Sequence, residues 1–534
     1  MNRVVLVLAL VAALWSAACG GSSATVTPPP PTGKFTPASL SGQYAFVTSG
    51  EVFTSGAITA SGFSRLGSFI ADGKGGITGG VEDTNTQGVA INQAVKITGG
   101  TYTVQANGRG TLTLNTTFNG TSSTVNFGIV LTSTSGGLLI DETVTGNQVS
   151  TGSGNFVLQT GAGSYSISSV NGPYVFDFSG TYPDTNNGPA SVVGEFQVSA
   201  GVVTFGVEDL NNSGAFTSAA TFGGSFTADP FDTSSLATFG RGLAQINGLH
   251  YVFYVVDATR VRFLNTDSPG SLAGDAVAQT TPAPTSPSGG FVFLVAGTDF
   301  SSGITRVGRF TINGTALSNV LVDTNDAGKF IQTNSANNAS ITLDQTNPGR
   351  GTGTFTDPAF SNAPFTFVFY LSSPTSGVIQ ETTIANNLAV DVADGSILAQ
   401  TGSPFTSSNI SGTYALNWSG LSSPQNNFPI DEEDFVAQAT VSSLALTGAG
   451  DLFQFSNGQL QTDVVAAGPI AISGDGTGST STTRNTMTLK LTSSKSETVD
   501  FVVYFVSPQV AFFADKDNNQ GTNRIVAGVL NAQQ

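Results

Sequence analysis

The chain has 534 residues and a formal net charge of −17; 39% of the residues are hydrophobic and only 10% are charged. This length exceeds what one hydrophobic core supports and predicts about three to five domains. The excess of acidic over basic residues (35 against 18) repels phosphate backbones, so we expect no nucleic-acid partner. The 65 glycines favour strands joined by tight turns.

The N-terminus has the features of an export signal. Arg3 precedes an apolar stretch, residues 4–15, that is too short to cross a bilayer, and small residues lead to Cys19. The segment resembles the lipobox of bacterial lipoproteins, although Ser16 stands where Leu is usual. The resemblance implies that residues 1–18 are removed and that Cys19 is lipidated. An ordinary signal peptide that contains a cysteine is the alternative.

Residues 19–39 are expected to form a tether that begins with Gly and Ser and stiffens at Pro28–Pro31. The lipid would make the membrane one partner, and Gly20 after the cysteine resembles outer-membrane sorting. The expected location is therefore the cell envelope, on either its periplasmic or its surface face. Cys19 is the only cysteine, so the folded part contains no disulfide and must be stabilised by burial and strand pairing.

Beyond the tether, landmarks recur roughly every 120 residues, which is the length of a whole domain. Each unit opens on Gly-x-aromatic and closes on a glutamine. The aromatic residues are Tyr44, Tyr174, Phe291 and Tyr414, and the glutamines are Gln159, Gln279, Gln400 and Gln533. The predicted domains are four β repeats at 40–160, 171–281, 288–402 and 410–534.

Two further motifs lie inside the repeats. Asp-x-Asn-x-x-Gly begins at Asp83, Asp209 and Asp323, and the fourth copy lacks it. Gly-Arg-Gly surrounds Arg109, Arg241 and Arg350, and the fourth copy has Gly476-Thr477-Gly478 in the corresponding place. The common order and spacing indicate that one unit was copied four times.

The pattern within the first copy predicts a run of short strands in chain order. The expected strands are 43–48, 63–71, 76–83, 89–97, 100–106, 110–117, 124–132 and 137–143, with 154–160 closing the unit. Turn-forming segments separate many of them, and helical periodicity is absent. Such a meander favours an all-β chain of four tandem antiparallel up-and-down barrels, since closure removes exposed edges. Tandem two-sheet sandwiches are the alternative.

The opening Gly-x-Tyr/Phe resembles the Gly-x-Trp that begins the first strand of lipocalins, avidins and other calycins. This chain departs from that pattern in having Tyr or Phe for Trp, and it lacks an evident arginine on the closing strand. As a whole the chain is similar to poorly characterised, repeat-containing bacterial lipoproteins, which implies a location but no activity.

One strand of each repeat is apolar on both faces, whereas a strand with one wet face alternates. These strands lie at 126–131, 250–256, 365–371 and 500–506. We therefore predict that their outer faces are covered by a neighbouring repeat, so that the domains form a compact cluster.

The motifs have two interpretations each. Asp-x-Asn-x-x-Gly resembles half of a calcium loop, but the twelfth positions, Ala94, Ala220 and Asn334, lack the closing carboxylate, so a turn is favoured. Asp515, Asp517 and Asn519 are a second calcium candidate. The Gly-Arg-Gly arginine is expected to cover apolar surface or to pair with a carboxylate, rather than to bind an anionic ligand.

Chemistry-bearing residues are sparse. His250 is the only histidine and is expected to be structural; once Cys19 is lipidated, no zinc site remains. Glu82/Asp83, Asp141/Glu142 and Asp431 to Asp434 are neighbouring acids, but successive residues of a strand face opposite sides. We predict no catalytic, cofactor or metal residues, and no cofactor.

These observations favour a non-enzymatic, lipid-anchored envelope or surface protein with a structural, adhesive or partner-binding role. The partner would be an unknown protein, glycan or apolar ligand. The alternatives are a binder of small apolar molecules inside the barrels, which needs a cavity of about 300 Å³, and a secreted hydrolase.

Overall fold

The computed structural model contains four closed antiparallel β-barrels that follow one another along the chain, which confirms the predicted fold class. It describes residues 33–54, 60–89, 91–145, 148–298, 302–333, 336–356, 364–383, 391–423, 431–454, 459–472, 484–493, 496–517 and 523–534. Residues 1–18, Cys19 and most of the tether lie outside the described residues. No helix in the described ranges is long and apolar enough to cross a membrane.

Barrel 1 follows a short 3-10 turn, η1 (Pro37–Ser39). Its strands are β1 (Ser41–Thr54), β2 (Ala60–Asp72), β3 (Gly76–Thr86), β4 (Asn92–Tyr102), β5 (Arg109–Phe118), β6 (Thr121–Ser133), β7 (Gly136–Asp141), β8 (Val144–Thr145) and β9 (Gln148–Leu158). Pairing of β1 with β9 closes the barrel, and the two-residue β8 pairs with β9 at one edge.

Barrel 2 follows η2 (Ile167–Ser169) and contains one short helix, α2 (Thr233–Phe239). Its strands are β10 (Gly172–Thr181), β11 (Pro189–Ser199), β12 (Val202–Asn212), β13 (Ala215–Thr221), β14 (Gly224–Thr227), β15 (Arg241–Ile246), β16 (Leu249–Asp257), β17 (Arg260–Asn265) and β18 (Ser271–Ala278).

Barrels 3 and 4 repeat this order. The strands of barrel 3 are β19 (Gly289–Thr298), β20 (Gly303–Asn313), β21 (Ala316–Asp326), β22 (Lys329–Thr333), β23 (Asn337–Leu343), β24 (Arg350–Thr356), β25 (Pro364–Ser373), β26 (Ser376–Glu381) and β27 (Val392–Ala399). Those of barrel 4 are β28 (Gly412–Ser423), β29 (Asp431–Ser442), β30 (Ala445–Gln454), β31 (Gln459–Ala471), β32 (Asn485–Thr492), β33 (Ser496–Ser507), β34 (Val510–Asp515) and β35 (Asn523–Ala532).

The fourth strand of the meander differs from the prediction and between copies. Two strands were expected at 89–97 and 100–106, but β4 runs through both, with a register shift between Ile97 and Gly99 that carries the strand past the break. In barrel 2 the same place is occupied by β13 and β14, and in barrel 3 by β22 and β23. A β-bulge within one strand of barrel 1 thus corresponds to an interruption between two strands in barrels 2 and 3, because both relieve twist at the same point.

Aromatic side chains fill the barrel interiors. In barrel 1, Tyr44 stacks on Phe69 with ring centroids 5.6 Å apart, and Phe46 meets Phe127 edge-on at 5.7 Å. All four opening aromatic residues belong to these interior clusters. The hydroxyl of Tyr44 also donates to the carbonyl of Thr134 (2.9 Å), so the opening strand is tied to the β6–β7 turn.

Each barrel closes where a glycine of its last strand meets the backbone of its first strand. A Cβ atom on Gly274 would lie 1.8 Å from the carbonyl oxygen of Asp177, a distance no side chain tolerates. The equivalent glycines and carbonyls are Gly154 and Val47, Gly395 and Leu294, and Gly528 and Asn417, at 1.9, 2.2 and 2.2 Å. The absence of a side chain at this position lets the two backbones approach closely.

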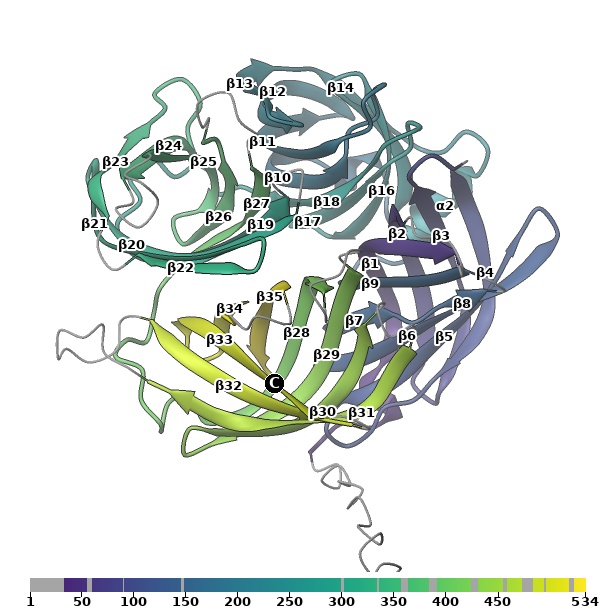
Figure 1. Ribbon diagram of the computed structural model, residues 1–534. Coiled ribbons are helices and arrows are strands. Elements are labelled where there is room, and N and C mark those ends of the chain that lie inside the picture. The colour runs from purple at the N-terminus through teal and green to yellow at the C-terminus, as the bar shows by residue number, and fades with distance from the viewer. Residues whose placement is uncertain are drawn as a thin grey trace, which may run out of the picture.

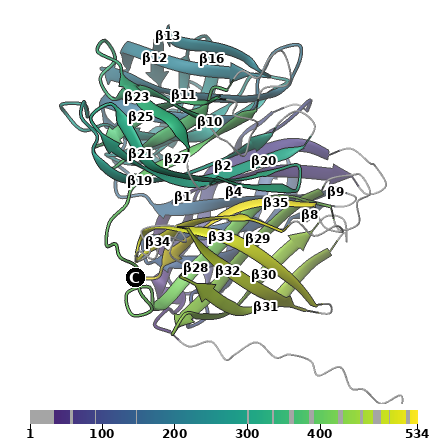
Figure 2. The same cartoon turned by 60° about the vertical axis from the view of Figure 1, so that its left-hand side comes forward.

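The four barrels are arranged as a closed ring (Figure 1), with barrels 2 and 3 above barrels 1 and 4 in the view of Figure 2. Each barrel packs its sixth and seventh strands against the first strands of the preceding barrel, and barrel 1 packs in the same way on barrel 4. We refer to these contacts as the 1–2, 2–3, 3–4 and 4–1 interfaces.

The predicted cover of the doubly apolar strands is confirmed. Val130, Tyr254, Tyr370 and Tyr504 lie on the outer faces of β6, β16, β25 and β33, and all four are fully buried against the preceding barrel. An apolar outer face therefore marks an inter-barrel contact rather than a second core within one barrel.

Candidate functional site

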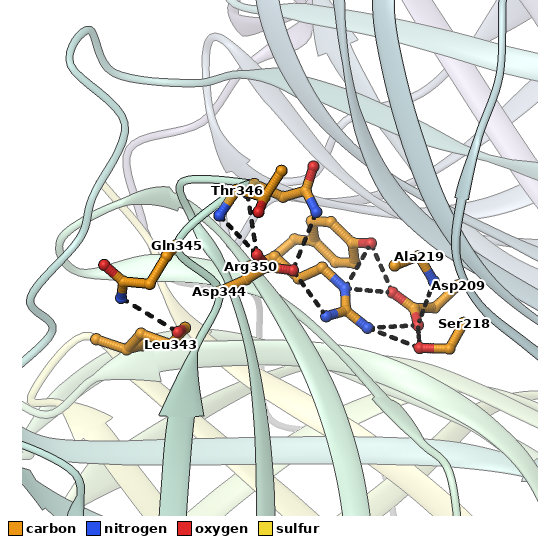
Figure 3. A network of polar contacts seen from close by, with 10 residues as sticks. Asp209, Ser218, Ala219, Leu343, Asp344, Gln345, Thr346 and Arg350 are labelled. Carbon is orange, nitrogen blue, oxygen red and sulfur yellow. Dashed lines mark hydrogen bonds and ion pairs between the residues drawn. The ribbon is translucent and has the colours of Figure 1, made fainter.

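The two internal sequence motifs meet each other across the 2–3 interface (Figure 3). Arg350 donates from Nε to Oδ2 of Asp209 and from Nη2 to Oδ1, both at 2.8 Å, in a bidentate pair. The hydroxyl of Tyr370 donates to Asp209 Oδ2 at 2.6 Å, and Ser218 donates to Oδ1 at 2.9 Å. A second acid, Asp344, accepts from Nη1 of Arg350 at 3.1 Å. The carboxylate of Asp209 is fully buried, so this ion pair operates with little solvent screening.

The same arrangement recurs at two other interfaces. At the 1–2 interface, Arg241 and Tyr254 bind Asp83 at 2.8 and 2.6 Å. At the 3–4 interface, Arg484 and Tyr504 bind Asp323, both at 2.6 Å. The repeated motifs are therefore two halves of one inter-barrel lock. The motif arginine was expected to cover apolar surface or to pair with a carboxylate, and in the structure it pairs with a carboxylate.

The fourth copy lacks both motifs, as its sequence shows, but it keeps the contacts of the lock through other residues. Asp451 takes the place of the motif aspartate: it pairs in register with Val436, as Asp209 does with Val193. Asp451 binds Arg109 of barrel 1 at 2.9 Å. Arg484 immediately precedes β32, as Arg350 begins β24, whereas Gly476-Thr477-Gly478 lies outside the described residues. The equivalence of these residues to the motif residues is shown by their positions in the strand pairing, because the glycines that flank the motifs in the other copies are missing here.

The phenol in each of three locks is held in its protonated form. Burial raises the pKa of Tyr254, Tyr370 and Tyr504, and the adjacent aspartate raises it further. A protonated phenol donates its hydrogen to the carboxylate. The 4–1 interface has Val130 at this position, and Nη1 of Arg109 binds a second acid, Asp463, at 2.8 Å, as Nη1 of Arg350 binds Asp344.

The closing glutamines form a second repeated contact. Each side-chain amide donates to a main-chain carbonyl near the end of the sixth strand of the next barrel: Gln159 to Val255, Gln279 to Leu371, Gln400 to Phe505 and Gln533 to Leu131. The backbone N–H of the following residue continues the pairing, and Gln534 bonds to Thr132 at 2.8 Å. The C-terminal residues thus bind barrel 1 as each preceding repeat end binds the next barrel.

The glycine of Asp-x-Asn-x-x-Gly forms the expected turn, while its polar residues serve the interface. Gly88, Gly214 and Gly328 have φ of +72°, +81° and +79° at hairpin turns. Asn85 donates to the carbonyls of Asn265 and Gly270 of barrel 2, both at 2.8 Å. Among the described residues, no group of three or more His, Cys, Asp or Glu side chains has the geometry of a metal site. Asn334 and Asn519 lie outside that part of the chain.

Three of the acids considered as catalytic pairs, Glu82, Asp141 and Glu433, are engaged in ion pairs inside their barrels. Glu82 and Asp141 flank Arg65 inside barrel 1 at 3.0 and 3.4 Å. In barrel 4, Glu433 accepts from Arg524 at 2.8 Å and from the indole of Trp418 at 3.0 Å. The side chain of Asp431 lies outside the described residues.

His250 is 61% exposed along its side chain and contacts Asp267 at 2.9 Å on the surface. This contact joins the start of β16 to the loop that follows β17. The structural role expected for His250 stays a prediction.

Two cavities bear on ligand binding. Within barrel 2 a space of about 10 Å³ remains beside Phe178 and Tyr251, roughly the room for one water molecule. A larger cavity of about 480 Å³ lies where barrels 1, 2 and 4 meet. Its walls carry amides, hydroxyls and Arg260, together with Leu138 and Val510. The larger space lies between barrels, whereas the lumen hypothesis requires one inside them.

The fold and its interfaces define a class of protein: a closed ring of four up-and-down barrels locked by a repeated Arg–Asp–Gln set. No known family model matches the chain, and no curated protein matches its sequence.

Solved structures with some similarity include a double mutant of transferrin binding protein B from Haemophilus parasuis Hp5. Its TM-score is 0.20 at 12% identity, covering 75% of this chain and 83% of that one. The isotype 1 transferrin binding protein B of Neisseria meningitidis has a TM-score of 0.21 at 8% identity, covering 74% and 84%. At TM-scores this low, the similarity supports no conclusion about the arrangement of the barrels in this chain or about its binding partner.

Proposed function

We propose that this chain is a non-enzymatic, lipid-anchored protein of the cell envelope whose ring of barrels is a rigid platform for a partner protein. The observation that carries the proposal is the use of the repeated side chains: arginine, aspartate and glutamine of each copy lock the barrels to one another. A ring fixed in this way holds the loops between its strands in a constant relative geometry, which suits binding on the outer surface.

The loop before α2 supplies a candidate contact. Phe231 is 98% exposed, so that its apolar ring lies in water. Such exposure is unfavourable for phenylalanine, which is usually buried. The loop is fixed beneath it: the backbone N–H of Phe231 donates to Asp229, whose other oxygen binds the buried Arg241. Large aromatic residues held in a fixed position are favoured binding anchors, because little side-chain freedom is lost when they are covered.

The alternatives have less support. The interior clusters of the described residues fill the barrels with phenylalanine, tyrosine and ion pairs, which leaves little space for an apolar ligand. A hydrolase needs acids that converge in a cleft, whereas Glu82, Asp141 and Glu433 are bound to arginine inside barrels.

One experiment in cells tests both parts of the proposal. A photoreactive phenylalanine analogue replaces Phe231, or the exposed Ser234 as a matched control, in chains with Cys19 or with Cys19→Ser. We expect the Cys19 chain in the membrane fraction and a discrete protein adduct from position 231 alone. Membrane association that persists in Cys19→Ser contradicts the anchor, and equal adducts or none at both positions contradict the contact at Phe231.

A further inference from the structure

Four equivalent pairs of side chains, one at each interface, differ in their chemistry. Each pair joins the residue three places after the opening aromatic residue to the closing strand of the next barrel, six places before its glutamine. In chain order the residues at these equivalent positions are Val47 and Ala273, Asp177 and Asp394, Leu294 and Ala527, and Asn417 and Ser153. Two interfaces are thus apolar at this position, one carries an amide and a hydroxyl, and one carries two acids.

At the 2–3 interface, carboxyl groups of the two barrels face each other. The carboxyl groups of Asp177 and Asp394 act on each other across the interface, and two acids this close are stabilised when one of them is protonated. Oδ1 of Asp177 is buried without a hydrogen-bond partner. Burial raises the pKa of Asp394 to about 6, and it raises that of Asp177 further, with Asp394 and Asp275 adding to the effect.

A second acid pair lies at the same interface. Burial raises the pKa of Glu195 to about 7, and Asp344 of barrel 3 raises it further. The amide of Gln279 at 2.8 Å and the guanidinium of Arg350 act in the opposite direction.

The 4–1 interface also brings acids of two barrels together. Glu142 of barrel 1 and Asp451 of barrel 4 both lie beside Gly128, and Glu142 Oε1 is buried without a hydrogen-bond partner. Burial raises the pKa of Glu142 to about 8, with Asp451 and Asp141 contributing and Arg109 opposing. Asp463 is the remaining acid at this contact, bound to Arg109.

A second group of acids lies further along the same interface. Asp434 accepts a hydrogen bond from Thr151 of barrel 1 at 2.5 Å, and burial raises its pKa to about 7. Burial also raises the pKa of Glu432, where Asp434 and Glu51 of barrel 1 add to the shift. Glu433 and Asp141 are the other acids that act on Asp434.

The groups that meet across the other two interfaces are of opposite charge or neutral. Arg241 binds Asp83 and Arg262 binds the side chain of Asn155 at the 1–2 interface. At the 3–4 interface Arg484 binds Asp323, and the buried Asp515 accepts the amide of Asn325 at 3.2 Å while lying near Arg524 of its own barrel. Burial raises the pKa of Asp515 too, with Asp517 and Glu433 of its own barrel adding to the effect, but its partner across the interface is the neutral amide of Asn325, so loss of its proton sets no acid of barrel 3 against it.

We propose that the ring opens along one diameter as the pH rises, through separation of the 2–3 and 4–1 interfaces. Barrels 1 and 2 then remain one closed pair and barrels 3 and 4 another, with residues 281–287 as the hinge between them.

The loss of ring stability at higher pH follows from the linkage between proton binding and closure of the ring. A carboxyl group whose pKa is raised in the closed ring stabilises the ring fully below its unfolded pKa, near 4, and that stabilisation is lost as the pH rises through the raised pKa. For the groups described above this window extends from about pH 4 to about pH 8. Deprotonation then sets like charges of two barrels against each other. Opening uncovers the apolar strips of the two interfaces, which include Val130, Val436, Val193 and Val368.

Hydrogen–deuterium exchange of the full chain carrying Cys19→Ser, at pH 5.5 and 8.5 with correction for the intrinsic exchange rate, tests the proposal. We expect the protection of backbone amides at the 2–3 and 4–1 interfaces to fall about tenfold or more between pH 5.5 and pH 8.5, relative to the protection of amides at the 1–2 and 3–4 interfaces. The reason is that a carboxyl pKa about one unit higher in the closed ring than in the open ring changes the closing equilibrium tenfold. Equal loss at all four interfaces, or none, overturns the proposal.

A substituted chain separates proton loss from a general effect of pH. Asp177→Asn with Asp394→Ser copies the natural pair Asn417 and Ser153, and Glu142→Gln with Asp434→Asn neutralises the 4–1 interface. This chain should keep its protection at pH 8.5, whereas the control Asp232→Asn, at a half-buried position before α2, should behave like the parent. If the substituted chain folds and still opens at pH 8.5, the proposal is contradicted. If the substituted chain does not fold, the comparison of the four interfaces in the parent chain still tests the proposal.

Discussion

Arg350→Met is expected to destabilise the folded ring by about 3–5 kcal/mol, since it leaves a buried carboxylate without its cation. Asp209 would keep Tyr370 and Ser218 as donors but lose two charge-assisted hydrogen bonds of 2.8 Å. Denaturant unfolding followed by far-ultraviolet circular dichroism, together with exchange protection at the 2–3 interface, measures the loss.

A double substitution identifies the cause. Arg350→Met with Asp209→Leu should recover most of the lost stability, because an apolar pair of similar volume removes the unpaired buried charge. The matched control is Arg260→Met, whose Nε lies 3.8 Å from Asp275 with the side chain 37% exposed, and it should cost less than about 1 kcal/mol. An Arg350→Met effect no larger than that of the control would show that the lock does not hold the barrels together.

Gly274→Ala is expected to destabilise barrel 2 by about 3 kcal/mol, at the upper end of overpacking effects. The added methyl group would lie 1.8 Å from the carbonyl oxygen of Asp177 and 3.0 Å from the ring of Phe178, so β18 must move away from β10 at the point of closure. Thermal unfolding and exchange protection of β10 and β18 measure the effect.

Gly223→Ala is the control for this substitution. Gly223 is exposed, and a Cβ atom there would meet nothing within 4 Å, so its effect should stay within about 0.5 kcal/mol. Equal stability of the two alanine variants would contradict the close approach of β18 to β10.

The barrel class, the repeat and the covered outer strands were predictable because each leaves a local pattern. Tyr254 and Tyr370 stand in strands that are apolar on both faces, which only a covered strand explains. The fourth strand was less predictable, since Gly99 and Gly100 permit either a break or a bulge, and contacts with the neighbouring strands decide between them.

The lock was not predictable from the motifs taken singly. Asp209 and Arg350 are 141 residues apart and belong to different barrels, so their pairing depends on how the barrels dock. The same chemistry in the fourth copy is carried by Asp451 and Arg484, which lack the glycines that marked the motif elsewhere. Register within a strand is retained where turn residues change, and it is the better guide to equivalent positions.

Barrel 4 closes the ring on barrel 1 through the contacts of Asp451 with Arg109 and of Gln533 with Leu131. Small-angle X-ray scattering of the Cys19→Ser chain at pH 5.5 distinguishes this closed ring from an open row of barrels. A compact body of this length should have a radius of gyration of about 23 Å, with a modest addition from the N-terminal segment. Four barrels in an open row, spaced roughly 30 Å apart, would give about 35 Å, and that value would contradict the closed ring.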